Sequence, residues 1–129
     1  MDQPFDTDRP PIWTGHVVLY SLEPSRSGAF YERLGLRAVA VMDDFAVMEL
    51  RGGTHLVIRR STGDGVGERA AGFDLMVDDL DAAWQAWSAD GVKVSEIGKD
   101  ERAIHRVFTV TDPDGNTIVV NDSHVVGPV

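Results

Sequence analysis

Segments with alternating apolar residues and segments with apolar residues at helical spacing follow one another in the same order twice along the chain. Each half contains one strand, one helix and then three further strands, and a polar, glycine-rich stretch separates the halves. The predicted strands are 16–20, 37–42, 45–50, 54–60, 73–77, 92–96, 104–110 and 117–121, and the predicted helices are about 25–34 and 80–89.

Residues with known capping preferences mark the start of both helices. Pro24 suits the first turn of a helix, and we expect Ser25 or Ser27 to cap the first helix. Asp78 or Asp79 is expected to cap the second helix.

The second half also contains a tryptophan pair and a strong turn. Trp84 and Trp87 fall on one face of the predicted helix, so we expect them in the core or at an interface. The segment 112–115, Asp-Pro-Asp-Gly, is typical of a turn. We therefore expect Asp112 and Asp114 to shape this turn rather than to bind a metal.

The repeated order of elements predicts the architecture. Two halves of this size cannot each bury a core well, so we expect them to pair within one domain, 1–129. Helices on one side of largely antiparallel sheets give an α+β layer fold built from two βαβββ modules. The expected parts are module one at about 13–60, a linker at 61–71, module two at about 72–122 and a C-terminal tail at 123–129.

Composition narrows the possible functions. The chain has 129 residues and a formal net charge of -9, and no cluster of Lys and Arg offsets that charge, so we expect no nucleic-acid partner. Cysteine is absent, which excludes disulfides, thiolate catalysis and cysteine-bound metals. The sequence has no apolar run of membrane-spanning length and begins with an acidic segment unlike a secretory signal. We therefore expect a cytoplasmic protein without a membrane partner.

Two stretches resemble signatures of the vicinal oxygen chelate superfamily, which includes glyoxalases, bleomycin-resistance proteins and ring-cleaving dioxygenases. The segments 16–20, HVVLY, and 28–36, GAFYERLGL, are similar to the family's first-strand histidine and helix end. The segment 108–118, FTVTDPDGNTI, closely matches the hairpin near the family's C-terminus. The helix within 77–84 also fits the second module, and the resemblance covers roughly 13 to 122.

This resemblance implies a homodimer whose mixed sheets curve into a cleft, with the helices on the outer face. It also implies a divalent metal held by one residue from each of four strands. The matching positions here are His16, Val57, Gly72 and Val119. Only His16 can ligate a metal, which argues against the usual centre, because a divalent ion needs several converging ligands. We therefore expect no cofactor, and a divalent metal is the alternative.

Strand alternation predicts which residues line the cleft. Apolar residues such as Leu19 and Leu56 are expected to face the helices, so their strand neighbours face the other way. Apolar walls with a few polar groups are typical of small-molecule sites. The predicted cleft residues are His16, Val18, Tyr20, Glu49, His55, Val57, Arg59, Asp74, Met76, His105, Val119 and Asn121.

Three functions fit this face. The first is metal-free binding of an aromatic or amphipathic small molecule, for which the acidic charge suits a cation. The second is a metal-dependent lyase, isomerase or dioxygenase with a relocated site that uses His16, Glu49, His55 and His105. The third is metal-free acid–base catalysis by His16 or His105 beside Asp74 or Glu49. The apolar tail 123–129 could cover the cleft, cross a partner subunit or fray.

Overall fold

The computed structural model describes residues 10–63, 66–100 and 105–122, and the side chains of Asp100 and His105 lie outside the described part. The expected C-terminal tail, 123–129, also lies outside the described residues. The first half contains β1 (His16–Ser21), α2 (Pro24–Leu34), β2 (Arg37–Val41), β3 (Phe45–Glu49), the 3-10 turn η1 (Arg51–Gly53) and β4 (His55–Arg60). The second half contains β5 (Arg69–Val77), α3 (Leu80–Ala89), β6 (Lys93–Val94), β7 (Gly98–Asp100), β8 (His105–Thr111) and β9 (Asn116–Asp122).

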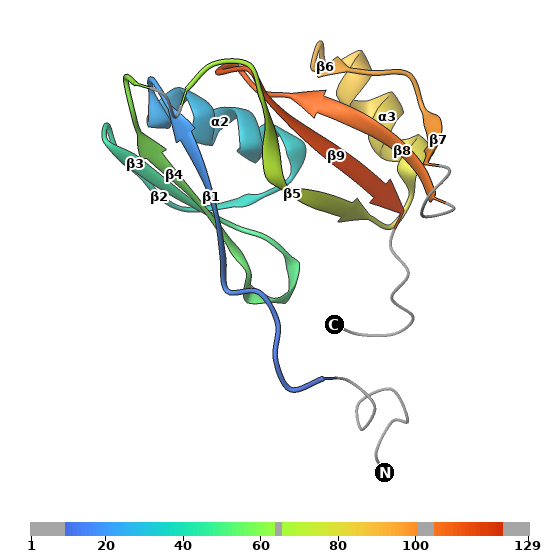
Figure 1. The fold of residues 1–129 in the computed structure, drawn as a ribbon, viewed down its shortest axis with the longest axis horizontal. Helices are drawn as coiled ribbons and strands as arrows, with labels where there is room; N and C mark the ends of the chain where they lie inside the picture. The colour runs from blue at the N-terminus through green and yellow to red at the C-terminus, as the bar shows by residue number, and fades with distance from the viewer. Residues whose placement is uncertain (1–9, 64–65, 101–104, 123–129) are drawn as a thin grey trace.

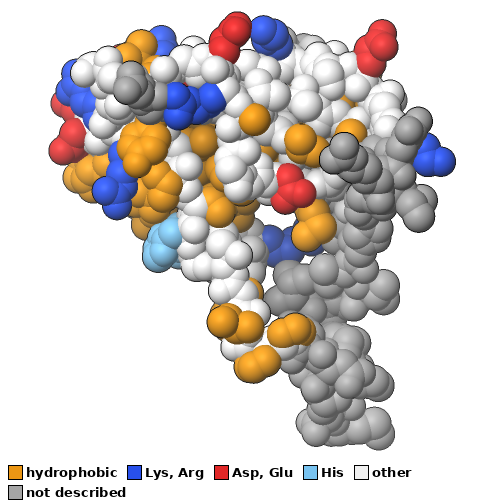
Figure 2. Space-filling view, viewed as in Figure 1, with side chains coloured by type: hydrophobic (Ala, Val, Ile, Leu, Met, Phe, Trp, Pro, Cys, Tyr) orange, Lys and Arg blue, Asp and Glu red, His pale blue; other side chains and the backbone are white. Residues whose placement is uncertain are grey.

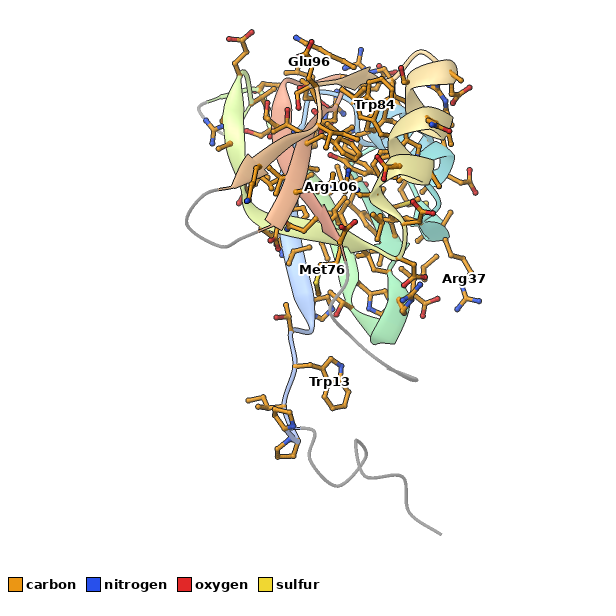
Figure 3. All side chains as sticks on the ribbon, turned by 90° about the vertical axis from the view of Figure 1, so that its right-hand side faces the viewer. Trp13, Arg37, Met76, Trp84, Glu96 and Arg106 are labelled. Carbon is orange, nitrogen blue, oxygen red and sulfur yellow. The ribbon has the colours of Figure 1, made fainter. Side chains whose placement is uncertain are left out.

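Each half forms one mixed sheet with one helix. The first sheet has the order β1-β4-β3-β2, and the second has the order β5-β9-β8-β6 with β7 paired to β8. In each module the first and the last strand pair in parallel, and the other pairs are antiparallel. Both helices lie on the same side of the sheets (Figures 1 and 3). This arrangement confirms the predicted α+β fold with two βαβββ modules.

The core lies between the sheets and the helices, where the predicted apolar strand faces meet. Leu56 and Ile58 of β4 are fully buried there, and so are their register partners Met48 and Ala46 on β3. Ile118 and Val120 of β9 are equally buried in the second sheet. Trp87 packs edge-on against Phe108 with ring centroids 5.7 Å apart. Trp84 is partly buried, and its indole Nε1–H donates to the carbonyl of Ser95. Of the expected places, core or interface, the core holds Trp87, and Trp84 packs against it.

The turn between β8 and β9 joins the two modules. Asp112 Oδ1 accepts the backbone N–H groups of Asp114 and Asn116, which closes the turn and confirms its predicted role. Asp112 Oδ2 accepts a 2.7 Å hydrogen bond from the Tyr31 hydroxyl of α2. Asp114 Oδ1 accepts the Leu22 N–H at 3.0 Å. Two turn carboxylates of module two therefore satisfy buried or half-buried donors of module one.

The helix starts differ from the prediction at α2 and agree with it at α3. Glu23 is the N-cap residue of α2 and makes no side-chain cap, so neither Ser25 nor Ser27 has the predicted role. Pro24 fixes the first helical residue instead, where a missing N–H costs nothing. At α3, the Asp79 side chain accepts the Ala82 N–H, as an N-cap residue should.

The second sheet departs from the prediction in two places. β5 begins at Arg69, inside the expected linker 61–71, because this part of the strand pairs in parallel with β9 across a register shift. The expected strand 92–96 is reduced to Lys93–Val94, and β7, which was not predicted, pairs with β8 beyond it. None of the described helices is both long and apolar enough to cross a membrane.

Candidate functional site

The sheet face that points away from the helices, called the open face here, carries most of the predicted cleft residues. In module one, the register of β1, β4 and β3 arranges them in rows across the strands. One row is polar, the next is aliphatic, and the third combines aromatic rings with an arginine. The rows are His16–His55–Glu49, Val18–Val57–Val47 and Tyr20–Arg59–Phe45.

The polar row contains a histidine pair. The rings of His16 and His55 are stacked with centroids 5.8 Å apart and an angle of 28° between their planes. Glu49, next to His55 in register, forms an ion pair with Arg37 of the neighbouring strand. The carboxylate nearest to the histidine pair in register is therefore already engaged by a cation.

Three hydrophobic side chains of the aliphatic and aromatic rows stay exposed within the described part of the chain, and Val57 and Val47 are half-buried. Val18 is 41% exposed, Tyr20 is 40% exposed and Phe45 is 37% exposed. Figure 2 shows hydrophobic side chains gathered on this part of the surface, with a histidine beside them. Uncovered apolar side chains that share one sheet face are typical of a binding surface.

Module two presents a smaller group on its open face. Asp74 pairs in register with Val119, and Met76 pairs with Asn121. The Asn121 side chain donates a 2.7 Å hydrogen bond to Asp74 Oδ2, which orients the carboxylate. Met76 is 58% exposed and projects from the sheet (Figure 3). His105 begins β8, but its side chain lies outside the described part.

The residues present do not fit the four-ligand metal centre that the resemblance implies. Of the four matching positions, Val57, Gly72 and Val119 offer no nitrogen or oxygen side-chain ligand. Among the described residues, no three His, Asp or Glu side chains gather closely enough to hold a metal ion. The alternative ligand set of His16, Glu49, His55 and His105 is also incomplete within the described side chains. His16 and His55 stack, but Glu49 is paired with Arg37, and the His105 side chain lies outside the described part.

A pocket of about 750 Å³ lies in the seam between the modules and was not predicted from the sequence. We call it the seam pocket. Its walls come from β1 and β5, which are edge strands of their sheets, and from the ends of α2 and α3. It brings together Glu49, Asp74 and Met76 of the predicted set, and the other described members of that set lie outside it.

Carboxylates surround the mouth of the seam pocket. Asp78 forms two hydrogen bonds with Arg51, at 2.9 and 2.5 Å. Arg51 lowers the pKa of Asp78 below its ordinary value by hydrogen bonding and by its charge. Glu49, Asp74 and Asp79 also line the pocket, and Arg51 is the one basic residue among the described lining residues.

The comparisons with known proteins agree with the fold. The model of the Glyoxalase/Bleomycin resistance protein/Dioxygenase superfamily matches residues 13–120. None of the curated proteins matches the chain significantly.

Solved structures of similar fold include a lactoylglutathione lyase from Agrobacterium tumefaciens, with 20% identity and a TM-score of 0.72 over 93% of this chain and 100% of that chain. A superfamily member from Sphaerobacter thermophilus has 19% identity and a TM-score of 0.73 over 87% and 98% of the two chains. A bleomycin-binding protein solved with bleomycin has 20% identity and a TM-score of 0.68 over 88% and 99%. At these identities the likeness shows a shared fold.

The family model covers most of the chain, and the two βαβββ modules have the fold of these structures. The chain therefore belongs to the glyoxalase/bleomycin resistance protein/dioxygenase superfamily.

Proposed function

We propose that this protein binds an aromatic or amphipathic small molecule on the open face, without the four-ligand metal centre of related enzymes. The observation that carries the proposal is the uncovered apolar surface formed by Val18, Tyr20 and Phe45. On the opposite faces of the same strands, Leu19, Ala46 and Met48 are buried. Covering such a surface with an apolar ligand is favourable by roughly 25 cal/mol for each Å² removed from water.

The polar residues of the open face give the ligand its orientation. The stacked rings of His16 and His55 provide an aromatic surface against which an aromatic group of the ligand can pack. The net charge of -9 favours a ligand that carries positive charge. The bleomycin-binding protein of similar fold makes bleomycin the first compound to test.

The choice between a binding protein and an enzyme depends on the metal. The positions Val57, Gly72 and Val119 cannot ligate, which supports the metal-free alternative. Metal content should be measured by mass spectrometry after incubation with Mn, Fe, Ni or Zn, for the wild type and His16→Ala. We expect less than stoichiometric metal in both proteins. Stoichiometric metal that His16→Ala loses would overturn the proposal in favour of a metal-dependent lyase, isomerase or dioxygenase.

The ligand is tested by calorimetric titration with bleomycin and with a panel of aromatic cations. We expect binding by at least one compound and about tenfold weaker binding by Tyr20→Ala, a loss of about 1.4 kcal/mol. Gln85→Ala, an exposed position on α3 behind the sheet, serves as the matched control and should bind like the wild type. Binding that Tyr20→Ala and Val18→Ala both leave unchanged would contradict an open-face site, as would a panel without any binding.

We further propose that the protein is a homodimer in the cytoplasm. Ile12 and Trp13 support the dimer, because they are 79% and 71% exposed on a segment that extends away from the sheets (Figure 3). Sedimentation velocity should give the mass of a dimer at micromolar concentration, and Trp13→Glu should shift the protein toward the monomer. A wild type that sediments as a monomer at every concentration would contradict this proposal.

A further inference from the structure

The seam pocket differs in location from the proposed open-face site. The pocket shares Glu49, Asp74 and Met76 with the open face, but the stacked histidines and Tyr20 lie outside it. The rest of its apolar lining on β1 and β5 comes from the helix-facing sides of these strands. Its volume of about 750 Å³ lies within the range of pockets that bind drug-sized molecules. The pocket is therefore large enough to hold a ligand of its own.

The walls of the seam pocket are apolar residues that the chain covers incompletely. Val17, Phe73 and Val77 face the helix side of their strands but are only partly buried. Leu19 also faces the helix side of β1 but does not line the pocket, and it is only 4% exposed. The partly buried residues are the ones that line the seam pocket, so an apolar body placed there would remove their remaining apolar surface from water.

The mouth of the pocket favours a positive charge. Glu49 and Asp78 are paired with Arg37 and Arg51, whereas no ion pair is formed by Asp74 or Asp79 within the described residues. Arg106, which interacts with the charge of Asp79, is already paired with Asp81. Asp74 uses one oxygen to accept the Asn121 amide, which leaves the second oxygen available to a ligand.

The helix end at the mouth does not provide an anion site. The first N–H groups of α3 are already satisfied, since Leu80 donates to Asp122 Oδ1 and Ala82 donates to Asp79 Oδ1. A ligand carboxylate would compete with these two aspartates for the same donors.

We propose that the seam pocket is a second binding site, which takes an amphipathic cation with its apolar body between β1 and β5 and its ammonium group at Asp74 and Asp79. Compounds that share one apolar group and differ in the charge of the head group separate the contributions of these two parts to the affinity. The probes are 4-phenylbutylamine, 4-phenylbutanol and 4-phenylbutyrate, which carry one phenylbutyl body and a positive, neutral or negative head. Trp87 lines the pocket and reports their binding by fluorescence in a Trp13→Phe/Trp84→Phe background.

We expect the dissociation constant from the Trp87 fluorescence titration to be at least tenfold lower for the amine than for the alcohol. The carboxylate should give no saturable fluorescence change. Asp79→Asn keeps the α3 cap oxygen and should weaken amine binding severalfold. Leu36→Phe and Val17→Phe each enlarge a side chain that lines the pocket, and each should weaken amine binding at least tenfold. The two filling variants are independent, so the test stands if one of them fails to fold.

Equal affinity for the amine and the carboxylate would overturn the proposal, and so would wild-type affinity in a folded filling variant. Tyr20→Ala separates the two sites, because it should leave amine binding in the seam unchanged while it weakens an open-face ligand. Loss of amine binding in Tyr20→Ala with retention in Leu36→Phe would assign the amine to the open face instead. If no ligand is found for the open face, amine binding in the seam pocket can still be tested, because the two measurements use different compounds and variants.

Discussion

The hydroxyl of Tyr31 donates a 2.7 Å hydrogen bond to Asp112 Oδ2, although the two residues belong to different modules. Tyr31 is only 1% exposed, and burial together with the Asp112 charge raises the pKa of its phenol. The bond therefore lies within the core and connects α2 to the β8–β9 turn. It gives two predictions on stability.

The first prediction concerns loss of this hydroxyl. Tyr31→Phe should lower the free energy of unfolding by about 1–3 kcal/mol, because it removes one of the two side-chain donors to the buried Asp112 Oδ2 and leaves only the Asn116 amide. Urea unfolding followed by circular dichroism measures the change. Tyr20→Phe removes a hydroxyl from a 40% exposed ring and should stay within about 0.5 kcal/mol. Equal effects in the two variants would show that the buried bond contributes nothing.

The second prediction concerns alkaline pH. The folded-state pKa of Tyr31 is raised, so its stabilising contribution is complete below the pKa of an unfolded tyrosine, about 10, and decreases as pH rises above that value. The wild type should lose up to about 1.4 kcal/mol of stability per pH unit above that point relative to Tyr31→Phe. Urea midpoints measured between pH 8 and about pH 11 test this, and parallel pH dependences would contradict it.

The third prediction concerns the turn that meets β5. Gly115 has φ +89°, and a Cβ there would lie 3.1 Å from the backbone N and Cα of Glu68. Gly115→Ala should therefore destabilise the protein by about 1–3 kcal/mol. Gly63→Ala is the control, since nothing lies within 4 Å of its added Cβ and its φ needs no glycine. Thermal unfolding should place the control near the wild type.

The fourth prediction compares two adjacent residues of β4 that face opposite ways. Leu56→Ala should cost about 2–5 kcal/mol, because Leu56 is 1% exposed and fills the core under the helices. Val57→Ala should cost less than about 1.5 kcal/mol, because Val57 lies on the open face. Urea unfolding of both variants checks the difference, and a larger loss in Val57→Ala would mean that the open face is covered in solution.

Most of the fold could be predicted because it rests on local patterns. Strand alternation identified the helix-facing residues Leu56 and Ile58 before the structure placed them in the core. The start of β5 could not be predicted, because the segment 69–72 is short in large apolar residues and becomes a strand only through parallel pairing with β9. β7 was missed for the same reason, since Gly98-Lys99-Asp100 has no apolar alternation and depends on β8.

The candidate site could be predicted only in part. Alternation placed His16, Tyr20 and Met76 on the exposed side of their strands, although their role in binding stays a prediction. The stacking of His16 on His55 needed the register between β1 and β4, which is a long-range property. The seam pocket needed the placement of β1 beside β5, which belong to different modules and lie far apart in the sequence.

The parallel pairing of first and last strands also has a consequence for the chain as it leaves the ribosome. Module one can complete its sheet once β4 has emerged, because β1 pairs with β4. At that moment the Tyr31 hydroxyl and the Leu22 N–H have no partner, since Asp112 and Asp114 are still to be synthesised. Until then these two donors can bond only to water, and the β8–β9 turn supplies their acceptors within the protein near the end of synthesis.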